Sequence, residues 1–259
     1  MLYNRGADAR MPASHTTPPQ SRLELEILPQ PDDITCGPTA LHAVYRYYGD
    51  PIEIERVVAE VPMLADGGTL AVMLGCHALR RGFDATIFSY NLQVFDPTWF
   101  ADGVDLADKL TRQREAKHDP KLHAATDAYL EFLRRGGEVR MQELNGRMLR
   151  RYLSRGRPIL TGLSATYLYG KAREIGATNE PDDVRGEPVG HFVVLSGYDK
   201  TSGTIEIADP YATNPLSDGH YYQTSVDRVI SAILLGVLTY DANLLLVRPP
   251  KPLAGSMEA

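Results

Sequence analysis

Cysteine is scarce in this chain, which has two cysteines, Cys36 and Cys76, among 259 residues. Two cysteines can form neither a disulfide framework nor a cysteine-only zinc site, and their scarcity is typical of proteins in a reducing compartment. We therefore expect a cytoplasmic protein. We also expect no metal, because no group of His, Cys, Asp and Glu residues has the close spacing of metal ligands.

An excess of positive charge is also lacking, since 27 Lys and Arg residues stand against 33 Asp and Glu residues, giving a net charge of −6. Nucleic-acid binding needs clustered Lys and Arg, so no nucleic-acid partner is expected. The longest apolar run, 230–240, is too short to cross a bilayer, and residues 1–22 lack the apolar core of a signal peptide. We expect no membrane association, a disordered tail over 1–22 and a second tail over 250–259.

The hydrophobic pattern between these tails predicts a mixture of helices and strands. Residues after Cys36 have apolar side chains at helical spacing, and Leu23, Leu25 and Ile27 alternate with glutamates as in a strand with one wet face. Helices are expected at 36–48, 52–61, 70–81 and 225–234, and strands at 23–28, 83–90, 157–163, 191–198, 204–208 and 243–247. The class is therefore α+β, with one domain over 23–249.

Two long polar segments interrupt this pattern. Residues 96–155 are charged and favour helices at 104–116, 121–135 and 143–152, so we interpret them as a helical insertion. Residues 167–189 contain several Gly and Pro residues and precede His191. Long segments of this kind are usually functional or disordered, so a substrate-facing lid and a disordered surface loop both remain open.

Cys36 lies where a loop containing Gln30 and Pro31 meets a predicted helix. Pro38 suits the first helical turn, because its missing N–H has no partner there. A thiol at this position meets the positive end of the helix dipole and free backbone donors, which favour a thiolate nucleophile. Cys76 lies between apolar residues of its own predicted helix and is expected to be a core residue.

A cysteine nucleophile needs a base, a group that orients the base, and donors for the developing oxyanion. His191 opens the predicted 191–208 hairpin and Asp209 follows it, so the hairpin brings the two side chains together. Asp209 would then orient His191, leaving the other ring nitrogen for the sulfur. Gln30 precedes Cys36 on the loop, so its amide and the Cys36 backbone N–H can point at one oxygen. The other histidines are not assigned to the site, and His77, His118 and His123 are expected at the surface.

Three segments of the chain resemble the papain-like cysteine peptidases, and most closely the C39 peptidase family, which processes double-glycine leaders, with its stand-alone relatives. They are Gln30 to Leu41 with its Cys-Gly-Pro-Thr-Ala-Leu run, Gly190 to Tyr198, and Ile207 to Tyr211. The resemblance implies a papain-like fold with the Cys36 helix on a mostly antiparallel sheet. It also implies that Cys36 is the nucleophile, His191 the base, Asp209 the orienting residue and Gln30 the oxyanion-hole side chain.

The implied activity is hydrolysis of a peptide or related amide through an acyl-enzyme, with no cofactor. Two alternatives stay open: an acyltransferase or peptide-modifying enzyme that uses the same triad, and a C39-like domain that only binds peptides. Exporter-linked relatives also carry an ATPase, whereas this sequence has no phosphate-binding Gly-x-x-x-x-Gly-Lys-[Ser/Thr] loop. This difference concerns the substrate rather than the chemistry.

Overall fold

A mostly antiparallel sheet organises the computed structural model, which describes residues 20–64, 67–176 and 178–250. Within these residues the sheet has eight strands, seven of them in the order β3-β2-β10-β4-β7-β8-β9, and β1 pairs with β7 outside this path. The pair β2–β3 is parallel and the other pairs are antiparallel. The strands are β1 Gln20–Arg22, β2 Asp84–Ser89, β3 Glu138–Arg140, β4 Ile159–Ser164, β7 Gly190–Asp199, β8 Thr204–Ala208, β9 Tyr221–Ser225 and β10 Asn243–Arg248.

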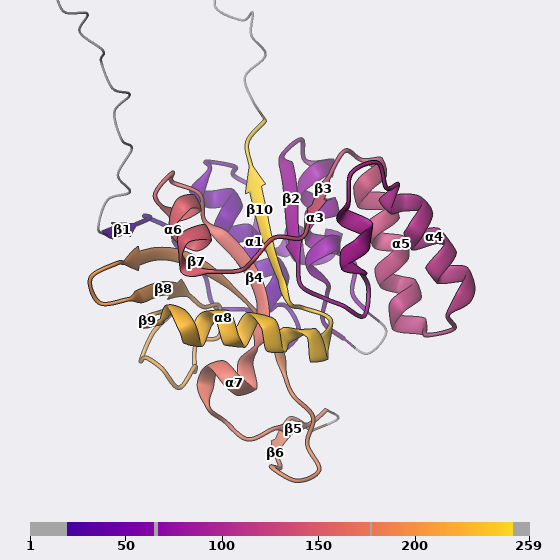
Figure 1. The fold of residues 1–259 in the computed structure, drawn as a ribbon. Coiled ribbons are helices and arrows are strands. Elements are labelled where there is room, and N and C mark those ends of the chain that lie inside the picture. The colour runs from indigo at the N-terminus through magenta and orange to yellow at the C-terminus, as the bar shows by residue number, and fades with distance from the viewer. Residues whose placement is uncertain (1–19, 65–66, 177, 251–259) are drawn as a thin grey trace, which may run out of the picture.

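Helices pack on both faces of this sheet (Figure 1). Helices α1 and α3 contact β7, β2 and β10, whereas α8 crosses the opposite face and contacts β4. A hairpin of α4 and α5 lies beside α3 at the β2–β3 end (Figure 1). The helices are α1 Cys36–Tyr47, α2 Ile54–Glu60, α3 Ala71–Arg80, α4 Leu106–Ala116, α5 Pro120–Arg134, α6 Gly146–Leu153, α7 Ala165–Tyr169 and α8 Val226–Leu235, with 3-10 turns η1 Pro97–Phe100 and η2 Gly236–Thr239.

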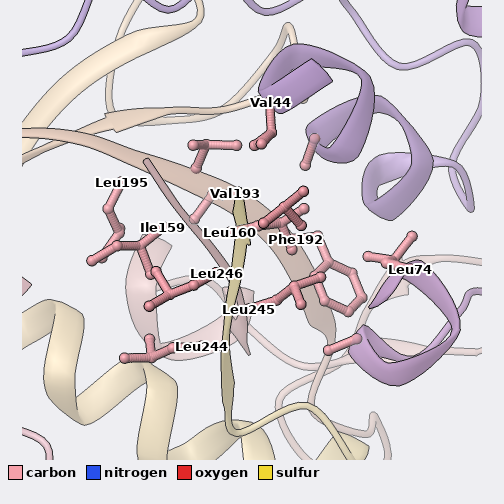
Figure 2. Packing of buried hydrophobic residues seen from close by; sticks show 14 of the residues in the cluster. Val44, Leu74, Ile159, Leu160, Phe192, Val193, Leu195, Leu244, Leu245 and Leu246 are labelled. Atoms are coloured by element: carbon pink, nitrogen blue, oxygen red, sulfur yellow. The ribbon is translucent and has the colours of Figure 1, made fainter. Parts of the chain in front are cut away.

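The hydrophobic core fills both sides of the sheet (Figure 2). Along β10 the side chains alternate, so that Leu245 lies toward Leu74 of α3 while Leu244 lies on the α8 side (Figure 2). All three leucines are at most 1% exposed. Strands buried on both faces are continuous apolar runs, which is why β4, β7 and β10 were predictable from composition.

Most of the predicted elements are present, with ends shifted by a few residues. The 191–208 hairpin is formed by β7 and β8, and Ser225 caps α8 by accepting a hydrogen bond from the Arg228 N–H. The prediction of a strand at 23–28 was wrong, because the strand in this region is β1, Gln20–Arg22. The predicted alternation is nevertheless present, since Leu23, Leu25 and Ile27 are buried and the glutamates between them are exposed.

Residues 96–155 hold the expected helices α4, α5 and α6, but they also contribute β3, which pairs with β2 at the end of the sheet. This segment is therefore built into the sheet as well as lying beside it. No helix among the described residues is both long enough and apolar enough to cross a membrane. The predicted tails lie almost wholly outside the described residues, apart from 20–22 and Pro250.

The polar segment 167–189 contains structure that its composition did not predict. It holds most of α7 and a two-stranded hairpin of β5, Glu174–Ile175, and β6, Glu180–Pro181. Strands of two residues have no hydrophobic periodicity, so a sequence pattern cannot reveal them.

His77 is a second departure from expectation. The prediction of a surface position was wrong: His77 is 0% exposed, its Nδ1 lies 2.8 Å from the Tyr45 hydroxyl, and its Nε2 lies 3.1 Å from Glu60 Oε2. These two partners compensate the polar ring for its burial. Cys76 is a buried free thiol beside it in α3, as predicted for a core residue.

Candidate active site

Cys36 is the first residue of α1, as predicted, and its side chain is partly exposed. Among the described residues, nothing accepts a hydrogen bond from the Cys36 backbone N–H. The next residue must be small, because a Cβ on Gly37 would lie 2.6 Å from Thr69 Cγ2 and 3.2 Å from the Phe192 ring. Glycine thus allows the start of α1 to lie close to β7, which carries His191.

His191 and Asp209 meet at the end of the β7–β8 hairpin, as the spacing of the sequence predicts. The Nε2 atom of His191 lies 2.8 Å from Oδ1 of Asp209. His191 is 7% exposed and Asp209 is 0% exposed. With Nε2 held by the carboxylate, Nδ1 is the ring nitrogen left for the Cys36 sulfur, which also interacts with the ring through a side-chain hydrogen bond.

Asp209 has three further donors, two of which belong to side chains outside the predicted motifs. The hydroxyls of Tyr169 and Tyr222 each donate to Oδ2 at 2.7 Å, and the Tyr211 backbone N–H donates to Oδ1 at 2.9 Å. Tyr169 belongs to α7 and Tyr222 to β9. The carboxylate is thus fixed from four directions, which favours its ionised form.

The electrostatics of this pair favour opposite charges. Burial opposes ionisation of Asp209, but His191 and the two tyrosine hydroxyls outweigh it, so the pKa of Asp209 is lowered. Burial likewise lowers the pKa of His191, but the negative charges of Asp209 and of the Cys36 sulfur outweigh burial and raise it. Burial and the neighbouring Asp209 charge raise the pKa of both tyrosines, which therefore remain hydrogen-bond donors.

Gln30 lies on the loop before α1, and its backbone N–H donates to the Pro210 carbonyl at 2.9 Å. This bond ties the loop to the residue after Asp209. The side-chain Nε2 donates to the Asp32 carbonyl at 2.7 Å, which uses one of its two N–H groups. The side-chain Oε1 of Gln30 is buried and has no hydrogen-bond partner among the described residues.

A cavity of about 250 Å³ brings three of these groups together, since Gln30, Cys36 and His191 all line it. The rings of Tyr169, Tyr211 and His191 form a triangle, with centroid distances of 6.1 Å and 6.3 Å from His191 to the two tyrosines and 6.4 Å between the tyrosines. We call this space the Tyr169 cavity. Residues of the 167–189 segment line much of it, and Asn179 donates to Asp33 on the Cys36 loop at 3.3 Å. This position favours the substrate-facing interpretation of the segment.

A second cavity of about 310 Å³ also has Cys36 in its lining. Asp241, Thr239, Lys121 and Phe192 line it, and we call it the Asp241 cavity. Asp241 is 5% exposed and was not predicted as a site residue. It follows η2 and is distant in sequence from all the predicted motifs, so no local signal marked it.

The structure therefore brings together all four predicted site residues. In the described part of the chain, no group of three His, Cys, Asp or Glu residues is arranged to hold a metal ion. A thiol at a helix start, a histidine bonded to a buried carboxylate and a nearby amide form the kind of arrangement found in papain-like cysteine peptidases.

The comparisons with known proteins identify the family. The family model described as "Peptidase_C39 like family" matches residues 22–229, so the chain belongs to this family, as its motifs indicated. The mostly antiparallel sheet with the Cys36 helix against it agrees with the predicted papain-like α+β fold. No match was found among curated proteins.

Several solved structures are similar to this one. One is a double-glycine motif protease from an AMS/PCAT transporter in complex with the leader peptide, 15% identical, with 89% of this chain and 95% of that chain covered and a TM-score of 0.42. Another is a C39-like peptidase from Bacillus anthracis, which is 14% identical; the match covers 88% of this chain and 96% of that chain, with a TM-score of 0.45. A third is xylellain, a cysteine protease from Xylella fastidiosa, which is 14% identical; the match covers 96% of this chain and 95% of that chain, with a TM-score of 0.43.

Proposed function

We propose that this protein is a thiol hydrolase that cleaves a peptide or related amide through Cys36, His191 and Asp209. The observation that carries the proposal is the shared cavity: Cys36 and His191 face one space, and Asp209 holds the imidazole from behind at 2.8 Å. Membership of a peptidase family supports the same activity.

In the first half of the reaction, His191 Nδ1 takes the proton of the Cys36 thiol and the sulfur attacks the substrate carbonyl carbon. The carbonyl oxygen becomes an oxyanion, which accepts hydrogen bonds from the free N–H of Gln30 and from the Cys36 backbone N–H. His191 then gives its proton to the leaving amine as the C–N bond breaks. The product is a thioester on Cys36.

In the second half, water attacks the thioester while His191 takes one of its protons. The tetrahedral intermediate uses the same two donors, and its collapse releases the carboxylic acid and the thiolate of Cys36. Asp209 keeps Nε2 protonated and the ring in one orientation throughout, which makes it a positioning residue rather than a group that touches the substrate.

A peptide library tests the proposal because it offers many candidate cleavage sites at once. We would incubate the protein with a proteome-derived peptide library and identify new carboxyl termini by mass spectrometry. New termini are expected with the unaltered protein and are expected to be lost in Cys36→Ser, whereas Cys76→Ser is the matched control and retains them. Cleavage that persists in Cys36→Ser, or no cleavage by the unaltered protein, contradicts the proposal.

The same assay with an added amine separates hydrolysis from acyl transfer. Water as the acceptor predicts free carboxylic acids even with a simple primary amine present at millimolar concentration. A preference for amide adducts over free acids would instead show that the acyl-enzyme serves a transferase, and would overturn the hydrolase assignment.

A further inference from the structure

Helix α7 connects the sheet to the segment that lines the Tyr169 cavity. It begins directly after β4, has five residues and ends with Tyr169. A helix of this length leaves most of its backbone carbonyls without partners inside the helix and is marginally stable by itself. Contacts with other parts of the chain must therefore fix its position.

The amino end of α7 is bonded to the residue two positions before His191. The Ala165 N–H donates to the Val189 carbonyl at 2.8 Å, and the Val189 N–H donates to Thr166 Oγ1 at 2.9 Å. These bonds and the preceding strand β4 hold this end of the helix. The carboxyl end, which carries Tyr169, needs a contact of its own.

Arg228 of α8 provides that contact. Its Nε donates to the Leu168 carbonyl at 2.8 Å, and its Nη2 donates to the Tyr167 carbonyl at 3.0 Å. Helix α7 lies against α8 here (Figure 1). Gly170 ends α7 with φ of 67° and leaves room for the guanidinium, since a Cβ at this position would lie 3.3 Å from Nη2. Basic side chains that bind the last carbonyls of a helix stabilise its C-terminus.

Tyr169 connects this fixed helix end to the triad. Its hydroxyl donates to Oδ2 of Asp209 at 2.7 Å, while Oδ1 accepts the hydrogen bond from His191 at 2.8 Å. Tyr222 donates to the same Oδ2 at 2.7 Å from β9. Because two donors occupy Oδ2, Oδ1 stays directed at His191, and the ring keeps Nδ1 toward Cys36.

We infer that Arg228 and Tyr169 are positioning residues for the proposed reaction: Arg228 fixes the end of α7, and Tyr169, at that end, fixes Asp209 and with it His191. This inference rests on the proposed function, because it concerns how His191 prepares Cys36 for attack. Loss of either contact should leave the protein folded and should reduce the share of molecules in which the imidazole faces the sulfur.

Alkylation of Cys36 by iodoacetamide measures this share without a substrate. A free thiol has a pKa of about 8.5 and is almost wholly protonated at pH 6, so fast reaction at pH 6 requires a positioned His191. At pH 9 a thiol ionises without help. The ratio of the rates at pH 6 and pH 9 therefore reports the position of His191. Labelling of Cys76, which is buried, detects a general loosening of the fold.

Single substitutions have defined expected effects. Tyr169→Phe keeps the ring and removes the hydroxyl, so the rate at pH 6 should fall about 10-fold, the size expected for one lost hydrogen bond to a charged group. Arg228→Met should lower this rate by no more than Tyr169→Phe does, and Arg228→Lys should recover part of the loss. The rate at pH 9 should be nearly unchanged in all three.

Arg173→Met is the matched control for Arg228→Met. The Arg173 guanidinium also donates to backbone carbonyls of the 167–189 segment, but to those of Asp183 and Val184 rather than to α7. Its rates should equal those of the unaltered protein. The other charged residues that line the two cavities next to Cys36 are the same in all variants, and these are Asp33, Lys121, Lys171, Glu174, Glu187 and Asp241.

Double substitutions test the order of the contacts. Arg228→Met should lower the rate at pH 6 little further in Tyr169→Phe, where the link to Asp209 is already lost. It should lower this rate in Tyr222→Phe, where Tyr169 still holds the carboxylate. An equal further loss in both double variants would overturn the inference, because Arg228 would then act independently of Tyr169. An equal fall at both pH values with labelling of Cys76 would also overturn it, since the two residues would then only stabilise the fold.

The inference and the proposed function fail in different ways. If Cys36 of the unaltered protein reacts faster than free cysteine at pH 6 and both single variants keep that rate, the inference is wrong and the proposed function stands. If Cys36 of the unaltered protein reacts no faster than free cysteine and the peptide library is not cleaved, the proposed function itself is wrong.

Discussion

The hydroxyl of Tyr222 offers a quantitative test of how Asp209 is held. Tyr222→Phe removes one hydrogen bond of 2.7 Å to a carboxylate that is 0% exposed, while Tyr169, His191 and the Tyr211 N–H remain as donors. A hydrogen bond to a charged group contributes about 1.5–3 kcal/mol. We expect urea unfolding at pH 7 to show a loss of this size.

The pH dependence of that loss has a defined sign. The pKa of Asp209 is lowered in the folded state, so its stabilising effect is present above the unfolded pKa and is lost as pH falls through the folded pKa. The difference between Tyr222→Phe and the unaltered protein should therefore be full at pH 7 and should shrink as pH falls through the folded pKa of Asp209. Removing the donor weakens a bond to the carboxylate and affects a protonated Asp209 less.

Tyr167→Phe is the matched control, because Tyr167 is 42% exposed and the Arg228 guanidinium packs against its ring rather than its hydroxyl. Its stability should change by no more than about 0.5 kcal/mol. If Tyr222→Phe is as stable as the unaltered protein at pH 7, or if its loss of stability does not shrink at low pH, the Tyr222 hydroxyl does not stabilise the Asp209 carboxylate.

Three further substitutions have expected outcomes. Gln30→Ala should lower kcat for a peptide found in the library assay by about 10²–10³-fold with little change in KM, because it removes an oxyanion donor; a changed KM alone would contradict this. Burial raises the pKa of Asp241 to about 7, above its unfolded value, so the unaltered protein loses stability as pH rises from 4 to 8 and Asp241→Asn does not. The stability of Asp241→Asn relative to the unaltered protein should therefore rise by up to about 4 kcal/mol over this range. If urea unfolding shows no such rise, the pKa of Asp241 is not raised in the folded protein. Gly37→Ala should lower the free energy of unfolding by about 1–3 kcal/mol, because its Cβ meets Thr69; unchanged stability in urea would refute that contact.

The catalytic candidates were predictable because each depends on local geometry. A cysteine after a loop of helix breakers begins a helix, and a hairpin brings its two ends together whatever surrounds it. Cys36, His191 and Asp209 follow from these two facts. The local sequences around them also match a peptidase family, which the family model confirms for residues 22–229.

The residues around the site could not be predicted, because they are brought there by contacts between segments that are far apart in the sequence. Tyr222 reaches Asp209 from β9, a strand that was not predicted, and Asp241 reaches the site from the turn between η2 and β10. Neither residue is part of a motif, and the order of strands in the sheet determines which residues they contact. Strand β3 was missed for a related reason, because three residues at the end of a sheet show no periodicity.

Alkylation of the two cysteines tests the central claim most directly. With limiting iodoacetamide at pH 7, peptide mapping should find the label on Cys36, at a rate above that of free cysteine and reduced in His191→Ala. Cys76 is the internal control, since burial raises the pKa of its thiol to about 11 and keeps it protonated. If Cys36 reacts no faster than free cysteine, or if Cys76 takes the label first, Cys36 is not an activated nucleophile.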